Sequence, residues 1–216
     1  MDYSSKAPYV ILYEDEDCLY VYKKRDVFSI RTNDKLTYTH NLYHYLYLYL
    51  SKKGERPFIV HRLDYETSGV MVFAKSQIVK ERLQSLFEEH KVERDYEAVI
   101  KEKIPLGKSF DVTNYIKKDG KHTSLVKENE GGDVAITHIK SSNYINIGTA
   151  MRVNIETGRH NQIRLAFSSL GLTLLGDKRF NGDVSKRLYL NAYKLAFPKE
   201  SLLAKQEVEV DPLWVK

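Results

Sequence analysis

The chain has 216 residues, of which 42% are hydrophobic and 29% charged, and its formal net charge is +5. This is ordinary globular composition, and no apolar run approaches the roughly 20 residues of a membrane-spanning helix. A single cysteine, Cys18, excludes an internal disulfide and favours a reducing compartment. Because nothing at the N-terminus is typical of a signal peptide, we expect a soluble, cytoplasmic protein with no membrane partner. The positive charge permits an anionic partner without requiring one.

Two β-rich runs open the chain, at Tyr9 to Tyr13 and Cys18 to Tyr22, and they flank four acidic residues. This pattern predicts a hairpin whose acidic turn is solvated rather than a metal site. The basic stretch from Lys23 to Asp26 follows. We expect a solvent-facing turn there, and contact with RNA phosphate is the alternative.

Leucine and aromatic residues alternate through residues 42–50. Strict alternation favours a strand, whereas Leu42, Leu46 and Leu50 at i, i+4 and i+8 favour a helix. Gly54 supplies a C-terminal stop after two lysines, so we predict a helix from about residue 40 to 52. The tyrosines are expected to pack in the core, and a base-stacking surface is the alternative.

A charged stretch, His61 to Gly69, lies between the apolar runs 58–60 and 70–73. It is typical of a structured loop that joins two buried strands, and loops held in this way often carry function. One imidazole, one guanidinium and two carboxylates fall within six residues. The residues alone allow two interpretations: a structural ion pair between Arg62 and Asp64, or a functional loop.

The rest of the chain predicts two helices and several strands. Ser76 can cap a helix through about His90, and a second helix is predicted from about residue 160 to 170. Strands are predicted at 94–100, 111–116, 135–140 and 145–155, with an edge strand at 208–210. A polar loop containing Lys117, Lys118, Lys121 and His122 links two of these strands, either as a phosphate contact or as a solvated hairpin tip. The segment 171–178 is rejected as a phosphate-binding loop, because Asp177 stands where that pattern needs lysine.

The charged loop, H-R-L-D-x-x-T-S-G followed by a hydrophobic strand ending in Ala-Lys, resembles the signature of RluA-type pseudouridine synthases, which isomerise uridine in RNA. Further family motifs match at Tyr96-x-Ala98-x-Ile100, at 132–137, at 157–165, at Gly176-Asp177 with Phe180, and at 188–192. The resemblance covers about residues 55–198.

Three departures from the family pattern stand out. Asn161 and Asn191 occupy positions where the family usually has histidine, and the usual Lys-Pro-x-Gly turn is replaced at residues 23–26. The small N-terminal RNA-binding domain of many relatives is expected to be absent. We therefore expect one catalytic domain over residues 1–216.

The resemblance implies that Asp64 is the catalytic carboxylate and that Tyr96 lies against the target uracil. Arg164 is expected to keep Asp64 ionised through two-pronged pairing, because an apolar pocket alone would discharge a carboxyl group. Arg62 corresponds to the family residue that enters the space vacated by the nucleotide in the RNA. The further residues expected to bind substrate are His61, Thr67, Leu190, Lys117, Lys118, Lys121, Lys178 and Arg179, with Lys186 and Arg187 adding to the basic rim.

The family isomerises uridine without exchanging electrons or groups, so no cofactor is expected, and no histidine spacing indicates a metal. The partner is expected to be structured RNA, a ribosomal or transfer RNA stem-loop, bound by a monomer. The resemblance implies an α+β fold with a mixed, mostly antiparallel β-sheet flanked by helices and a central active-site cleft. Two alternatives remain: a catalytically silent RNA-binding module with the same fold, and a hydrolase that uses Asp64 on another glycoside.

Overall fold

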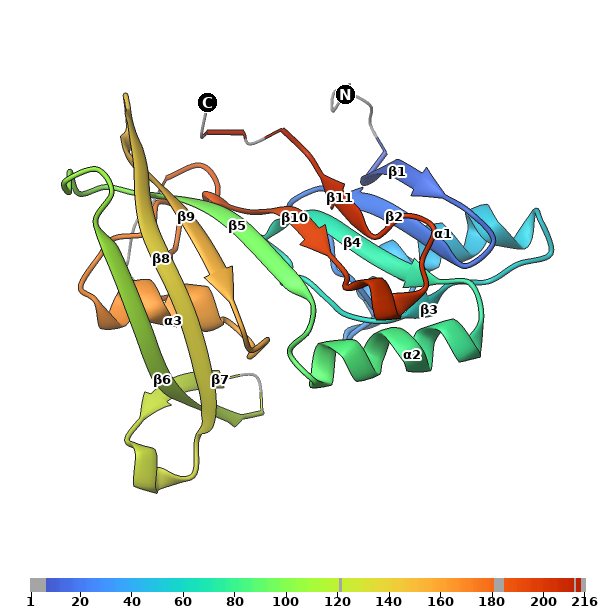
Figure 1. The fold of residues 1–216 in the computed structure, drawn as a ribbon, viewed down its shortest axis with the longest axis horizontal. Helices are drawn as coiled ribbons and strands as arrows, with labels where there is room; N and C mark the ends of the chain where they lie inside the picture. The colour runs from blue at the N-terminus through green and yellow to red at the C-terminus, as the bar shows by residue number, and fades with distance from the viewer. Residues whose placement is uncertain (1–6, 121, 181–184, 212, 215–216) are drawn as a thin grey trace. The chain divides into compact units, whose positions relative to one another are not determined.

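The computed structural model describes residues 7–120, 122–180, 185–211 and 213–214 (Figure 1). The chain forms two compact units. Unit 1 comprises the chain up to Val92 together with Lys194–Val210, and unit 2 comprises Glu93–Tyr193 together with the chain from Asp211 onward. Among the described residues, no helix is both long and apolar enough to cross a membrane.

The described residues of unit 1 form a small sheet and two α-helices. Its elements are β1 (Tyr9–Glu14), β2 (Cys18–Lys23), a 3₁₀ turn (Lys35–Thr37), α1 (Leu42–Ser51), β3 (Phe58–Ile59), β4 (Ser68–Ala74), α2 (Gln77–Glu88), a second 3₁₀ turn (Lys199–Ser201) and β11 (Glu207–Glu209). The strand order is β1-β2-β4, with β3 also pairing with β4. In the antiparallel register of β2 and β4, Cys18 lies opposite Ala74 and Lys23 opposite Gly69. The end of β2 therefore lies beside the start of β4.

Three predictions in unit 1 are confirmed. The first two strands form an antiparallel hairpin. The helix predicted at 40–52 is α1, whose buried residues are Leu42, Leu46 and Leu50. The helix predicted after Ser76 is α2, which begins where the Ser76 hydroxyl accepts a hydrogen bond from the Val79 amide, but it ends at Glu88 instead of His90.

The prediction that the α1 tyrosines pack in the core is wrong for Tyr47, whereas Tyr43, Tyr45 and Tyr49 are half-buried. The leucines fill the buried side of the helix, and Tyr47 is 45% exposed. Tyr49 is half-buried, and its hydroxyl donates a hydrogen bond of 2.8 Å to the Glu14 carboxylate. Residues at i, i+4 and i+8 share one helix face, so the leucines exclude the tyrosines from it.

The described residues of unit 2 form a longer antiparallel sheet with one α-helix against it (Figure 1). Its elements are β5 (Glu93–Ile100), β6 (Ser109–Asp119), β7 (His122–Val126), a 3₁₀ turn (Glu128–Glu130), β8 (Asp133–Ile145), β9 (Gly148–Ile155) and α3 (Gln162–Ser169). The strand order is β5-β9-β8-β6-β7, and each of these pairs is antiparallel. Helix α3 contacts β6 and β8, and Leu165 packs there with Ile116 and Ala135.

One further strand, β10 (Leu190–Ala196), is divided between the units after Tyr193. In unit 1 its last three residues pair antiparallel with β11. The edge strand predicted at 208–210 is therefore confirmed, one residue earlier than expected.

Two predictions for unit 2 are corrected. The single strand expected at 145–155 is a hairpin turn followed by β9, because β8 runs on to Ile145 and Gly148 starts the next strand. The polar loop expected around Lys117 is mostly strand: Lys117 and Lys118 belong to β6 and pair with Ser124 and Thr123 of β7. Lys121 lies outside the described residues. The strands are predominantly antiparallel and are accompanied by helices, so the α+β fold class is confirmed.

Leu46 offers a test of the α1 packing. Leu46→Ala should lower the free energy of unfolding by about 2–5 kcal/mol, because it removes buried methyl groups and leaves a cavity. Leu48, on the same helix, is 48% exposed, so Leu48→Ala should change that free energy by less than about 0.5 kcal/mol. Urea unfolding followed by circular dichroism measures both, and equal losses would show that the helix buries a different face.

Candidate active site

The charged loop that carries Asp64 lies in unit 1 and is anchored by buried side chains. Leu63 and Thr67, on either side of Asp64, are buried. The Ser29 hydroxyl donates to the Leu63 carbonyl oxygen at 2.7 Å and accepts from the Leu63 amide at 3.2 Å. The Thr67 amide donates to the Asp64 carbonyl oxygen at 3.2 Å. These bonds fix the backbone around Asp64, whose side chain is half-buried.

His61 is engaged within unit 1. Its Nε2 accepts a hydrogen bond of 3.1 Å from the Val72 amide, and its ring stacks on Phe87 with centroids 4.8 Å apart. A nitrogen that accepts from a backbone amide carries no proton, so this arrangement holds the neutral imidazole and ties the loop to β4. Arg62, the next residue, is exposed.

Lys23 is the residue of this region that sequence reasoning assigned wrongly. Instead of facing solvent, its side chain is 0% exposed. Its ammonium group donates to the carbonyl oxygens of Lys24 at 3.1 Å, Val27 at 2.8 Å and Tyr65 at 3.2 Å. Three donors matched to three acceptors satisfy a lysine completely, and one acceptor belongs to the loop residue next to Asp64.

The charge of Lys23 is coupled to that of Asp64. Burial lowers the pKa of Lys23 to about 7, and the negative charges of Asp64 and Asp26 oppose that shift. The sequence contained one signal for this site. A lysine at the end of a β-rich run lies at the position where the family turn also begins with lysine, but its burial depends on the strand pairing.

In unit 2, Tyr96 lies on the central part of β5 and is buried. Arg94 precedes it by two residues on the same strand and is also buried. The Arg94 guanidinium donates to the carbonyl oxygen of Glu156. No sequence pattern indicated Arg94, because a single arginine in a strand usually lies at the surface.

Arg164 lies in the first turns of α3 and is buried together with Asp177. Its Nη2 and Nε atoms donate to the two carboxylate oxygens of Asp177 at 2.6 and 3.1 Å. Asp177 also accepts from the amides of Arg179 and Phe180 at 3.1 and 3.2 Å. The sequence led us to expect two-pronged pairing of Arg164 with Asp64. Within unit 2, Arg164 makes a pair of this geometry with Asp177.

The loop before α3 is fixed by buried amides. Gln162 accepts from the Thr157 hydroxyl at 2.8 Å and from the Arg159 amide at 2.9 Å, and it donates to the Ile136 carbonyl oxygen at 2.9 Å. Asn161 adopts a left-handed backbone conformation with φ of 58° and donates to the Thr123 hydroxyl at 2.9 Å. Asparagine tolerates this conformation better than most residues.

The other replaced histidine position is also occupied by a bonded amide. Asn191 is fully buried and donates to the Glu97 carboxylate at 3.0 Å. Glu97 additionally accepts from the amides of Leu213 and Trp214 at 2.6 and 3.1 Å. Both asparagines are thus integrated into unit 2 through hydrogen bonds of their own.

The remaining expected substrate residues differ in exposure. Lys117, Lys118, Lys178 and Arg179 are exposed, whereas Thr67 and Leu190 are buried. The loop residues of the charged signature lie in unit 1, while Tyr96, Arg164, Leu190 and the described basic residues of the rim lie in unit 2. Within the described part of the chain, no group of three histidine, cysteine or acidic residues is arranged to hold a metal ion.

Residues 17–169 match the model of the RNA pseudouridylate synthase family, and the chain belongs to that family. The resemblance to RluA-type pseudouridine synthases is confirmed.

Two curated relatives and one solved structure illustrate the similarity. The chain is 33% identical over 182 residues to ribosomal large subunit pseudouridine synthase D of Vibrio cholerae. The aligned segment covers 81% of this chain and 53% of the relative. It is 33% identical over 177 residues to the RNA pseudouridine synthase YhcT of Bacillus subtilis, covering 80% of this chain and 57% of the relative. The chain thus spans about half the length of the curated relatives it matches. Human RNA pseudouridylate synthase domain containing 4 shares the fold, with a TM-score of 0.73 at 20% identity over 94% of this chain and 88% of that one.

The buried Lys23 predicts a specific pH dependence of stability. Its pKa is about 7 in the folded protein and 10.5 ordinarily, so between these values the unfolded chain binds a proton that the folded protein lacks. The cost of burying the charge is fully present below pH 7 and disappears as the pH approaches 10.5. Relative to Lys23→Met, the wild-type free energy of unfolding should therefore rise by roughly 1 kcal/mol per pH unit between about pH 7 and 9.

Urea unfolding at a series of pH values measures this difference. Lys52→Met is the matched control, because Lys52 is exposed and its removal should leave the pH dependence of the wild type unchanged. Identical pH dependence in the Lys23 and Lys52 variants would contradict a buried, titrating Lys23.

Proposed function

We propose that this chain is an RNA pseudouridine synthase, which isomerises specific uridines in structured RNA to pseudouridine. The observation that supports this most is the signature loop itself, with Asp64 held between the buried residues Leu63 and Thr67 in a member of the RNA pseudouridylate synthase family. The two relatives described above are named as synthases, and one of them as acting on the large ribosomal subunit. Ribosomal RNA is therefore the first substrate to test, and a transfer RNA stem-loop is the second.

The chemistry requires a carboxylate at the sugar. The bond between uracil N1 and ribose C1′ breaks, the base turns, and a new bond joins C5 to C1′. An ionised carboxylate can attack C1′ or stabilise the positive charge that develops there, as in glycoside hydrolysis. The alternative role is to assist loss of the proton at C2′. Asp64 is the proposed carboxylate. Lys23 lies close enough for its charge to interact with that of Asp64.

Tyr96 and Arg164 are proposed to act on the same uridine. Tyr96 offers a ring on which uracil can stack and a hydroxyl for the proton that leaves C5. Arg164 is proposed to orient Asp64, and its guanidinium is itself held in place by Asp177. The proposed catalytic domain comprises residues 1–216.

Binding is proposed to rest on base extrusion and phosphate contacts. Turning a nucleotide out of folded RNA costs a few kcal/mol, and Arg62 is proposed to fill the space it vacates. His61, Thr67 and Leu190 are proposed to support the pocket, and Lys117, Lys118, Lys121, Lys178 and Arg179 to contact phosphate. Because the isomerisation transfers no electrons or groups to a third molecule, we propose that it uses no cofactor. The enzyme is further proposed to act as a monomer and without a metal ion.

The decisive experiment is a map of pseudouridines in total RNA. A strain lacking the gene should lose pseudouridine at one or a few positions, and the purified protein should restore it on unmodified transcripts of the same RNA. A binding protein without activity would leave every site unchanged while still binding the transcript. Release of free uracil instead of pseudouridine would identify a glycoside hydrolase.

Asp64→Asn should reduce pseudouridine formation below detection while leaving RNA affinity within about tenfold, because phosphate contacts supply most of the binding free energy. Glu66→Gln is the matched control, since it removes a neighbouring negative charge from the same loop and should retain most activity. Single-turnover assays and filter binding measure the two quantities. An Asp64→Asn variant with near wild-type turnover would remove Asp64 from the mechanism.

The proposed phosphate contacts predict a change in salt dependence. Changing Lys117, Lys118 and Lys121 together to Ala should raise the Michaelis constant and flatten the dependence of RNA affinity on salt, by up to about one unit of log–log slope for each phosphate that is no longer neutralised. A second triple variant, Lys101, Lys103 and Lys108 to Ala, removes the same charge from exposed positions before the start of β6. If both triple variants behave alike, the hairpin of β6 and β7 contributes only general positive charge.

A further inference from the structure

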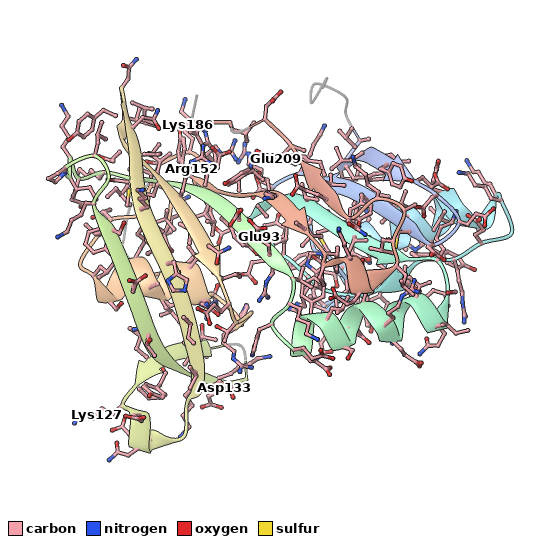
Figure 2. The ribbon with its side chains drawn as sticks, viewed as in Figure 1. Glu93, Lys127, Asp133, Arg152, Lys186 and Glu209 are labelled. Carbon is pink, nitrogen blue, oxygen red and sulfur yellow. The ribbon has the colours of Figure 1, made fainter. Side chains whose placement is uncertain are left out.

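Arg94 and Tyr96 share one face of β5. Successive side chains in a strand point to opposite faces, so residues two apart lie on the same face, about 7 Å from each other along the strand. Both side chains are buried, with Arg94 8% and Tyr96 9% exposed. Glu93, labelled in Figure 2, marks the exposed start of this strand. A permanent positive charge therefore lies in the interior of unit 2 close to the proposed uracil-contacting tyrosine.

The Arg94 guanidinium also contacts the segment that leads into α3. It donates to the carbonyl oxygen of Glu156. A Cβ atom added at Gly158 would lie 2.8 Å from Nη1 of Arg94, which is closer than real Cβ contacts come. Gly158 belongs to the Thr-Gly-Arg sequence of the third family motif. Arg94 thus connects the strand of Tyr96 with the loop that precedes Arg164.

Burying an arginine to make these contacts costs free energy of folding. Desolvation of a guanidinium opposes folding, and replacing buried charges with apolar residues is often neutral or stabilising. Burial indeed lowers the pKa of Arg94, while the charge of an ionised Tyr96 raises it. The two side chains also share one face of β5, so a negative charge on the Tyr96 oxygen would lie near the Arg94 guanidinium.

We propose that Arg94 is a positioning residue of the isomerisation: it holds Tyr96 against the third-motif loop and stabilises the phenolate form of Tyr96 that accepts the proton from C5. This inference rests on the proposed pseudouridine synthase function. It assigns to Arg94 a role that acts through Tyr96 and requires no contact between Arg94 and the RNA.

The proton transfer concerned is the last step of the isomerisation. After C5 has bonded to C1′, the C5–H bond breaks and its electron pair forms the C5=C6 double bond. The C6=N1 pair moves to N1, which takes a proton from solvent. The C5 proton passes to the Tyr96 oxygen, which has entered the step as phenolate and later releases the proton to solvent.

The test measures single-turnover rates on unmodified transcripts of large-subunit ribosomal RNA, made with either hydrogen or deuterium at C5 of uridine. Arg94→Met should slow formation of pseudouridine by about 10- to 100-fold while changing the dissociation constant of the RNA by less than about threefold. Its rate should show a larger deuterium isotope effect than the wild-type rate, because transfer of the C5 proton becomes limiting. Arg94→Lys keeps the charge and should recover part of the rate.

Arg152, labelled in Figure 2, provides the matched control. It lies on the neighbouring strand β9 but is exposed, and its guanidinium donates to the Tyr193 hydroxyl. Arg152→Met should leave both the rate and the isotope effect unchanged. An unchanged isotope effect in Arg94→Met would overturn the proposal, even if that variant were slower, because a general loss of structure slows all steps alike.

Gly158→Ala tests the same contact while keeping Arg94. The added methyl group should displace the guanidinium and reproduce part of the rate loss, and in the Arg94→Met background it should have little further effect. Full additivity of the two changes would overturn the proposal. If wild-type protein forms no pseudouridine, the proposed function fails; if the wild type is active and the Arg94 variants match it, this inference alone fails.

Discussion

The buried ion pair between Arg164 and Asp177 is the interaction on which unit 2 depends most. Asp177 is completely buried, and its carboxylate accepts from both the Arg164 guanidinium and two amides of the following turn. Removing one member of such a pair costs about 3–5 kcal/mol, because the other charge remains buried without compensation. The turn requires glycine at position 176, because a Cβ atom there would overlap the Arg187 carbonyl oxygen. The pair therefore fixes the position of helix α3 and of the Arg164 side chain at once.

Unit 1 also contains a buried basic side chain that fixes the surrounding backbone, in this case a lysine. Lys23 donates to three carbonyl oxygens and thereby fixes the backbone next to Asp64. Burial lowers the pKa of this side chain to about 7, although the charges of two carboxylates oppose the shift. In each unit, a buried basic side chain thus fixes neighbouring groups through hydrogen bonds in a region with a proposed catalytic role.

The departures from the family pattern are local substitutions within an intact fold. Asn161 and Asn191 stand where histidine is usual, yet each donates a hydrogen bond from its amide to a partner in unit 2. An asparagine Nδ2–H group can replace an imidazole N–H group as a donor, although it cannot act as an acid or base near neutral pH. Both positions therefore carry amides that are hydrogen-bonded within unit 2 and that neither gain nor lose a proton near neutral pH.

The sequence by itself determined the hairpin of β1 and β2, helices α1 and α2, and the signature loop, because local periodicity, capping residues and a contiguous motif specify them. It did not determine how far the α1 tyrosines are exposed, because that depends on which segments pack beside the helix. The tertiary structure alone revealed the burial of Lys23 and Arg94 and the pairing of Arg164 with Asp177. Those features depend on contacts between segments distant in sequence, and the pKa of a charged side chain follows from the burial and partners that only these contacts create.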